Sequence, residues 1–234
     1  MNFNKYKIEF KQNLKGNICL ILSHKEFHYL KNKEYIKLRL GTKGIINALS
    51  EFEDIKKITI GFIEKTVEIK EKKNKLKIFI NHITQAICIK IDQLESKLRG
   101  VDLSDFELLN SKSFEKFYKK IDSYIPLKQR KVGFKTFTEI KKKDDRNHEF
   151  DMFIRGSGLG IEKGNLLKEN SKYGILSVHH GDNRLNRGSP VGFWEVNYKE
   201  NSGITIQLLN QELDGGKVVS IARLKTQKNP TENK

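Results

Sequence analysis

Short apolar runs in the first half of the chain predict strands. Asn17–Ser23 is an apolar run typical of a strand, and Tyr35–Leu40 and Ile58–Ile63 fit strands as well. The next segment, Glu64–Lys77, mixes charged and aliphatic residues and fits either a long edge strand or a hairpin. The first half of the chain therefore predicts a sheet.

The segments after these predicted strands have patterns typical of helices. Ile78–Leu98 ends with apolar residues three and four positions apart, opposite a charged face. Ser104–Asn110 and Ser113–Tyr124 predict short helices, and Ser113 can cap the second of them.

The pattern changes after a basic and polar stretch that ends near residue 148. Phe150–Ile154 predicts a strand, and a glycine-rich loop follows it. Ile161–Asn170 predicts a short helix and Tyr173–Val178 a second strand. Strand, loop, helix and strand in this order are typical of a parallel crossover unit.

Helical and strand-like segments also follow one another in the last part of the chain. Ser189-Pro190 can start a helix, because serine caps well and proline suits the first helical position, and Val191–Tyr198 continues it. Ile204–Leu209 and Val218–Ile221 predict two more strands. The elements together predict an α/β protein with a mixed sheet and helices on both faces.

Composition adds limits to this interpretation. The net charge is +16, and most of the excess lies before residue 151. A preference for anionic small ligands is a simple use of this charge, so we do not expect a nucleic-acid partner. No apolar stretch is long enough for a membrane helix, and the N-terminus lacks a signal-peptide pattern, so we expect no membrane partner and a cytoplasmic location.

The two cysteines, Cys19 and Cys88, each lie in an apolar run. We interpret them as buried, reduced thiols. A disulfide framework or a zinc site needs more cysteines at closer spacing.

Two loops carry candidate chemistry. Arg155–Gly160 has the spacing G-x-G-x-G, which differs from the dinucleotide pattern and by itself fits a structural turn or a nucleotide site. The second loop begins with His179 and His180 and continues to Gly188. These histidines fit ordinary surface residues or, with Asp182, a metal site, although no HExxH or cysteine set supports a metal.

These loops belong to a longer series of motifs. In order, the chain contains Ser177-Val178-His179, Arg187-Gly188, Pro190, Trp194, Gly203-Ile204-Thr205-Ile206 and Leu213-Asp214-Gly215-Gly216. Over Phe150–Val219 this series resembles the formyl-tetrahydrofolate-dependent formyltransferases. The His-His-Gly-Asp-Asn and Gly-Phe-Trp-Glu variants are similar to members linked to sugars, and we interpret the chain as a shortened member.

The resemblance implies a Rossmann-like formyltransferase fold and three catalytic residues. His179 donates to the oxyanion and to the leaving nitrogen, and Asp214 accepts the amine proton and faces His179 across one cleft. Ser177 stands where most members have asparagine, and Asn183 is a possible substitute for that amide. Trp194 is expected to pack its helix onto the sheet.

The resemblance also implies the ligands. The formyl donor is 10-formyltetrahydrofolate, and the acceptor is a small-molecule amine, most simply a nucleotide-linked amino sugar. The pterin is expected to lie against backbone at a set of residues after two strands: Arg155, Gly156, Ser157, Gly158, Leu159, Gly160, Ile161 and Asn210. The alternative is an inactive relative that binds a ligand or a nucleic acid.

Three segments follow from this interpretation. We expect a divergent N-terminal α/β portion over 1–100, a formyltransferase catalytic core over 101–222 and a polar tail over 223–234.

Overall fold

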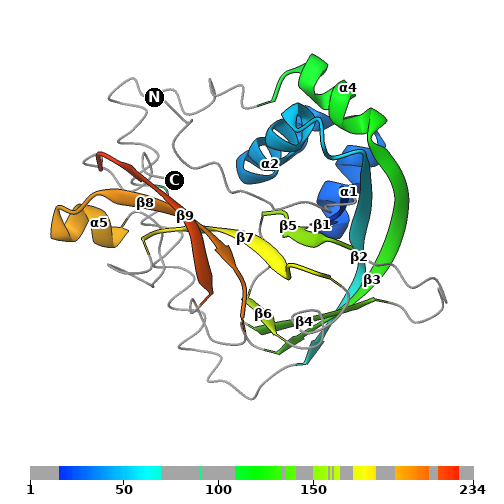
Figure 1. The fold of residues 1–234 in the computed structure, drawn as a ribbon. Helices are drawn as coiled ribbons and strands as arrows, with labels where there is room; N and C mark the ends of the chain where they lie inside the picture. The colour runs from blue at the N-terminus through cyan, green and yellow to red at the C-terminus, as the bar shows by residue number, and fades with distance from the viewer. Residues whose placement is uncertain are drawn as a thin grey trace. The chain divides into compact units, whose positions relative to one another are not determined.

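A computed structural model describes residues 16–69, 90, 109–132, 135–140, 150–157, 159, 161–163, 171–182, 193–210 and 216–226 (Figure 1). Their contacts divide them into two compact units. The first lies within Met1–Ile69, Glu107–Val178 and Ile206–Ser220, and the second within Lys70–Phe106, His179–Thr205 and Ile221–Lys234. The predicted boundary near residue 100 lies outside the described residues, and the three predicted segments stay predictions.

Nine strands are described, and each has at least a part in the first unit. They are β1 (Asn17–Leu22), β2 (Lys57–Ile69), β3 (Ile121–Val132), β4 (Lys135–Ile140), β5 (Met152–Arg155), β6 (Ile161–Lys163), β7 (Ile175–His180), β8 (Ser202–Leu208) and β9 (Lys217–Leu224). Their order in the sheet is β6-β4-β3-β2-β1-β5-β7-β8-β9.

Most of the defined strand pairs are parallel. β1 lies between β2 and β5 and is parallel to both, with Ile18 opposite Ile58 on one side and Met152 on the other. β3 is parallel to β2, β7 to β5 and β6 to β4, whereas β3 and β4 form an antiparallel hairpin. The predicted mixed α/β sheet is therefore confirmed.

The central strand β1 has apolar residues on both faces, as expected for a parallel strand that is covered on both sides. Leu20 and Leu22 belong to one core cluster, and Cys19 and Ile21 belong to another. Cys19 is buried and free, which confirms the sequence interpretation for this cysteine, whereas Cys88 lies outside the described residues.

Four α-helices and one 3-10 helix are described. They are α1 (His24–Lys31), η2 (Tyr35–Lys37), α2 (Leu40–Glu51), α4 (Ser111–Lys119) and α5 (Phe193–Tyr198). Ser23 caps α1 by accepting from the backbone N–H of Glu26, and Asn110 caps α4 by accepting from the N–H of Ser113.

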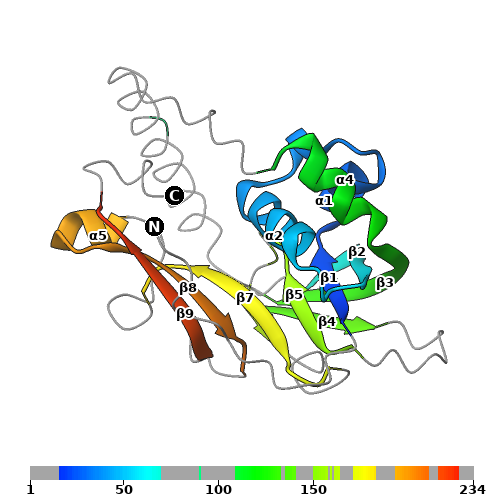
Figure 2. The same ribbon diagram turned by 45° about the horizontal axis from the view of Figure 1, so that its top comes forward.

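The helices α1, α2 and α4 lie on the same side of β1, β2 and β3 (Figure 2). Leu30 of α1, Ile46 of α2 and Phe117 of α4 are fully buried in the first core cluster together with strand residues. The second cluster consists of strand residues and others such as Phe150 and Leu159. The helix predicted over Ile78–Leu98 lies outside the described residues except for Lys90, which is helical.

Some predicted elements are wrong. Tyr35–Leu40 is not a strand but a 3-10 turn followed by the start of α2. The ring of Tyr35 packs against the ring of Phe114, with centroids 5.2 Å apart. Tertiary packing here overrides the local strand preference. The helix predicted over Ser113–Tyr124 ends at Lys119, and β3 begins at Ile121.

The predicted helix over Ile161–Asn170 is also wrong at its start, because Ile161–Lys163 forms β6. This strand pairs with β4, which supplies hydrogen-bond partners that a local pattern does not reveal. The parallel arrangement of β5 and β7 is nevertheless the predicted one.

Candidate functional site

The order of strands in the first unit reverses at β1. The chain proceeds from β1 outward through β2 and β3, and later returns through β5 and β7 on the other side of β1. In open α/β sheets, ligands bind outside the carboxyl ends of the strands at such a switch point. Ser23 follows β1 and Gly156 follows β5, so both residues lie at this position.

The start of the glycine-rich loop lies directly against β1. The backbone N–H of Gly156 donates to the carbonyl oxygen of Ile21 at 2.8 Å. A Cβ atom at Gly156 would lie 2.9 Å from that oxygen and 2.9 Å from a methyl group of Leu22. Only glycine fits this close approach without a shift of β1.

The next residue, Ser157, contacts the first turn of α2. Its N–H donates to Oγ1 of Thr42 at 3.1 Å, and its carbonyl oxygen accepts from Nη1 of Arg39 at 3.1 Å. Gly41 leaves space for the serine hydroxyl, because a Cβ atom there would be 2.2 Å from Oγ. Leu159 is buried in the second core cluster, while Gly158 and Gly160 lie outside the described residues.

The amino end of α2 is capped from another helix. The N-cap residue Arg39 has no side-chain hydrogen bond to its own helix, but its backbone N–H donates to Oε1 of Glu26 at 3.3 Å. Glu26 is buried, and a carboxylate at this end interacts favourably with the helix dipole.

Arg155 is the last residue of β5 and the first of the glycine-rich loop, and its side chain is buried. Its guanidinium faces the buried carboxylate of Glu162, with Nη2 and Oε2 3.8 Å apart. Burial lowers the pKa of the Arg155 guanidinium, and the charge of Glu162 partly offsets this effect.

The second unit contains the histidine loop. His179 is half-buried near the end of β7, and the loop continues through Gly181 to Asp182. The N–H of Gly181 donates to the carbonyl oxygen of Gly203 at 2.8 Å, and the hydroxyl of Thr205 donates to the carbonyl oxygen of Gly181 at 2.7 Å. The residues that follow His179 are thus tied to β8.

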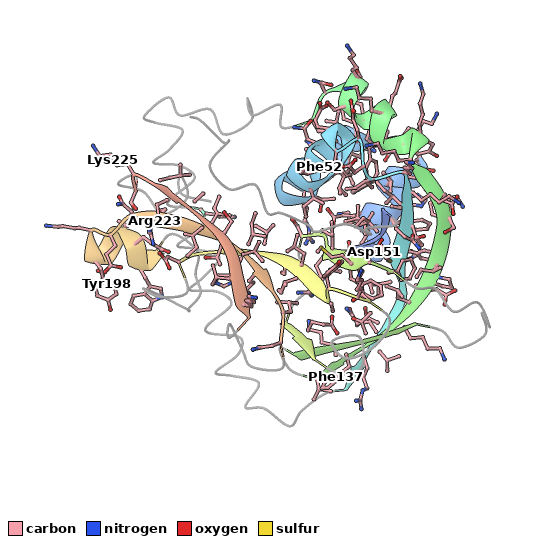
Figure 3. The ribbon with its side chains drawn as sticks, viewed as in Figure 1. Phe52, Phe137, Asp151, Tyr198, Arg223 and Lys225 are labelled. Atoms are coloured by element: carbon pink, nitrogen blue, oxygen red, sulfur yellow. The ribbon has the colours of Figure 1, made fainter. Side chains whose placement is uncertain are left out.

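Asp182 is buried in the same unit and pairs with Arg223 of β9. The guanidinium donates to Oδ2 through Nη2 at 2.8 Å and through Nε at 3.1 Å. Arg223 is labelled in Figure 3, where its side chain extends from β9. Since Asp182 faces a cation, this pairing argues against the metal alternative for the histidine loop.

Within the described part of the chain, no group of three histidine, cysteine or acidic residues is arranged to hold a metal ion. None of the helices in the described ranges is both long and apolar enough to span a membrane.

The other predicted site residues are only partly described. Ser177 is half-buried on β7 within the first unit, and Asn210 is exposed just after β8. Asp214 and Asn183 lie outside the described residues, so the facing of His179 and Asp214 stays a prediction. Trp194 is half-buried on α5 and stacks on exposed Tyr198, with ring centroids 5.7 Å apart.

Sequence reasoning missed the residues that hold the two loops. Arg39 and Thr42 contact the glycine-rich loop, Glu162 faces Arg155, and Arg223 holds Asp182. A charged residue inside the strand-like run around Ile221 was a usable signal for Arg223, whereas nothing local marks Thr42.

The chain was also compared with known proteins. No family model matches it, and no curated protein matches it in sequence. Among solved structures it is similar to a 4-N formyltransferase from Francisella tularensis, with a TM-score of 0.35 and 13% identity. The alignment covers 92% of this chain and 64% of that chain, so this chain spans less than two thirds of the matched protein.

Proposed function

We propose that this chain transfers a formyl group from 10-formyltetrahydrofolate to an amine on a nucleotide-linked amino sugar. The observation that carries the proposal is the place of the glycine-rich loop, which leaves β5 beside β1 at the switch point of the sheet. The motif series from Ser177 to Gly216 supports the chemistry through its resemblance to formyltransferases.

The reaction needs a donor at the formyl oxygen and an acceptor for the amine proton. As the amine nitrogen bonds to the formyl carbon, negative charge develops on the carbonyl oxygen, and His179 donates to it. A donor at this place is worth ~3–4 kcal/mol of barrier. Asp214 takes the proton of the amine, and His179 passes a proton to the leaving nitrogen as its bond to the formyl carbon breaks.

Ser177, two residues before His179 in the sequence, fits this role. Ser177 has a hydroxyl that can donate to the same oxygen, although it reaches less far than an asparagine amide. Gly156 and Ser157 lie at the carboxyl end of β5, next to β1. The resemblance implies that the pterin lies against the loop that they begin. The net charge of +16 favours an acceptor that carries phosphate.

The test is release of tetrahydrofolate from 10-formyltetrahydrofolate with a panel of nucleotide-linked amino sugars. We expect His179→Ala and Asp214→Asn to abolish transfer and to leave binding of a folate analogue largely intact, because these side chains act on charge of the transition state. His28→Ala, a change of a histidine on α1, is the matched control and should keep activity.

A second candidate is a non-catalytic protein that keeps the fold and binds ligand. The presence of Ser177 where most formyltransferases have asparagine favours this candidate. Wild-type protein that binds the folate analogue in calorimetry but formylates no amine would support it. Binding of neither folate nor amino sugar, together with salt-dependent binding of nucleic acid, would rule out the formyltransferase proposal.

A further inference from the structure

A buried ion pair joins the two flanks of the glycine-rich loop. Arg155 is the last residue of β5 and Glu162 is the middle residue of β6. Their charged groups are 3.8 Å apart, and their side chains are 8% and 2% exposed. Because β5 pairs with β1 and β7 while β6 pairs with β4, this contact links separate parts of the sheet.

The carboxylate of Glu162 is held by Thr138 on β4. The backbone N–H of Thr138 donates to Oε1 at 2.9 Å, and its hydroxyl donates to Oε2 at 2.8 Å. Thr138 is itself buried, with 1% exposure. A carboxylate with these donors and a guanidinium nearby has a fixed orientation.

The polar contacts continue across two more strands. Nε2 of Gln129 donates to Oγ1 of Thr138 at 3.3 Å, and Oγ1 of Thr66 donates to Oε1 of Gln129 at 3.1 Å. Thr66, Gln129 and Thr138 are directly opposite one another in the registers of β2, β3 and β4. Glu162 is therefore supported by a row of polar side chains rather than by one contact.

Stability alone is a weak reason for such an arrangement. Desolvation of two buried charges offsets most of their attraction, and apolar replacements of similar size are often neutral or stabilising. The place of the pair, at the base of a loop whose next residues contact β1 and α2, indicates a role in the geometry of that loop.

We propose that Arg155 and Glu162 are positioning residues, which set the path of the glycine-rich loop so that its backbone can receive the pterin of the formyl donor. The part that concerns the pterin rests on the proposed function. The pair keeps the two ends of the loop together, and the contacts of Gly156 with Ile21 and of Ser157 with Thr42 then form without a further ordering cost.

The test compares wild type with the double variant Arg155→Met/Glu162→Leu. We expect it to fold but to exchange the amide protons of Gly156 and Ser157 about tenfold faster in NMR, since the loop opens more often. The amide of Phe153, bonded to the carbonyl oxygen of Gly174 at 3.0 Å, should exchange as in wild type.

Calorimetry with a folate analogue gives the functional readout. The double variant should bind it about tenfold more weakly, because the loop must be ordered on binding. Neutralisation of the exposed Lys37–Glu34 pair by Lys37→Met/Glu34→Leu is the control and should change neither readout. Wild-type exchange and affinity in the Arg155/Glu162 double variant would overturn the proposal.

Two further outcomes are decisive. If the double variant does not fold, Glu162→Gln keeps the shape but removes the charge, and unchanged exchange at Gly156 and Ser157 in that variant would overturn the proposal. If wild type binds no folate analogue, the proposed function fails, and the exchange measurement still decides whether the pair positions the loop.

Discussion

Arg223 donates two hydrogen bonds to one carboxylate oxygen of Asp182, whose side chain is 1% exposed while that of Arg223 is 46% exposed. The buried carboxylate thus has a partner that reaches it from the surface. Because Asp182 follows Gly181, which is bonded to Gly203, the pair adds a second attachment at the start of the histidine loop.

We expect Arg223→Met to destabilise the protein by ~1–3 kcal/mol, because it leaves the buried carboxylate of Asp182 without this donor. Urea unfolding at neutral pH measures the effect. Lys225→Met, a change of an exposed residue two positions further on, should alter the free energy of unfolding by less than about 0.5 kcal/mol. Equal stability of the two variants would show that the pair contributes nothing.

Gly203 packs against the backbone of Asp182. A Cβ atom at this position would be 2.7 Å from the backbone nitrogen and 3.1 Å from Cα of Asp182. We therefore expect Gly203→Ala to lower the melting temperature, since backbone atoms on both sides must move. A variant that melts at the wild-type temperature would contradict this close packing.

At Gly44 on α2 we expect alanine to raise the stability rather than lower it. Nothing lies within 4 Å of a Cβ atom built there. Because alanine is a better helix former than glycine, Gly44→Ala should stabilise the protein by ~0.5–1 kcal/mol. Thermal unfolding of the two glycine variants side by side tests both expectations.

Lys120 stabilises the carboxyl end of α2. Its Nζ donates to the carbonyl oxygens of Leu49 at 3.0 Å, Ser50 at 3.2 Å and Phe52 at 2.7 Å. Burial lowers the pKa of the Lys120 amine, and the charge of Glu51 works in the other direction. The amine replaces water at carbonyl groups that a helix end leaves without internal partners.

Removal of this amine by Lys120→Met should cost ~1–2 kcal/mol, because three carbonyl groups lose their donor. Lys116→Met is a suitable comparison, since Lys116 makes a 3.4 Å pair with Glu51 and both side chains are exposed. The loss expected for that surface pair is below about 0.5 kcal/mol. Chemical denaturation that ranks Lys116→Met as the more damaging change would refute the assignment.

The thiol of Cys19 should be unreactive in the native protein. It is fully buried in β1, and burial raises its pKa well above the usual range, so almost no thiolate forms near neutral pH. In a Cys88→Ser background, a thiol reagent should label no cysteine before denaturation and one after it. Rapid labelling of native protein would mean that β1 is accessible.

The sequence was most informative where one element has one clear pattern. β1 is recognisable because it is covered on both faces and carries an unbroken apolar run. β6 is not recognisable, since it has three residues and a glutamate at its centre. That glutamate is buried against Thr138 and Arg155, which lie on other strands.

Contacts between residues far apart in the sequence also limit how much of the candidate site can be predicted. The motif series located the two loops, because glycines and histidines mark them in the sequence. The contacts that hold these loops join residues far apart in the chain: Ser157 and Thr42 are 115 positions apart, and Arg223 and Asp182 are 41 apart. Local periodicity carries no information about such pairs.

The strand order also has a consequence for the way in which the chain folds. The hairpin of β3 and β4 joins neighbouring segments, so its loop closes at small entropic cost. β1 and β5, by contrast, are far apart in the sequence. Ile18 pairs with Met152, and the neighbouring hydrogen bond from the N–H of Asn17 to Oδ2 of Asp151 spans 134 positions. Pairings with this separation form slowly. The switch point between β1 and β5 is therefore expected to be completed late, so that a partly folded chain has its hairpin before it has its ligand site.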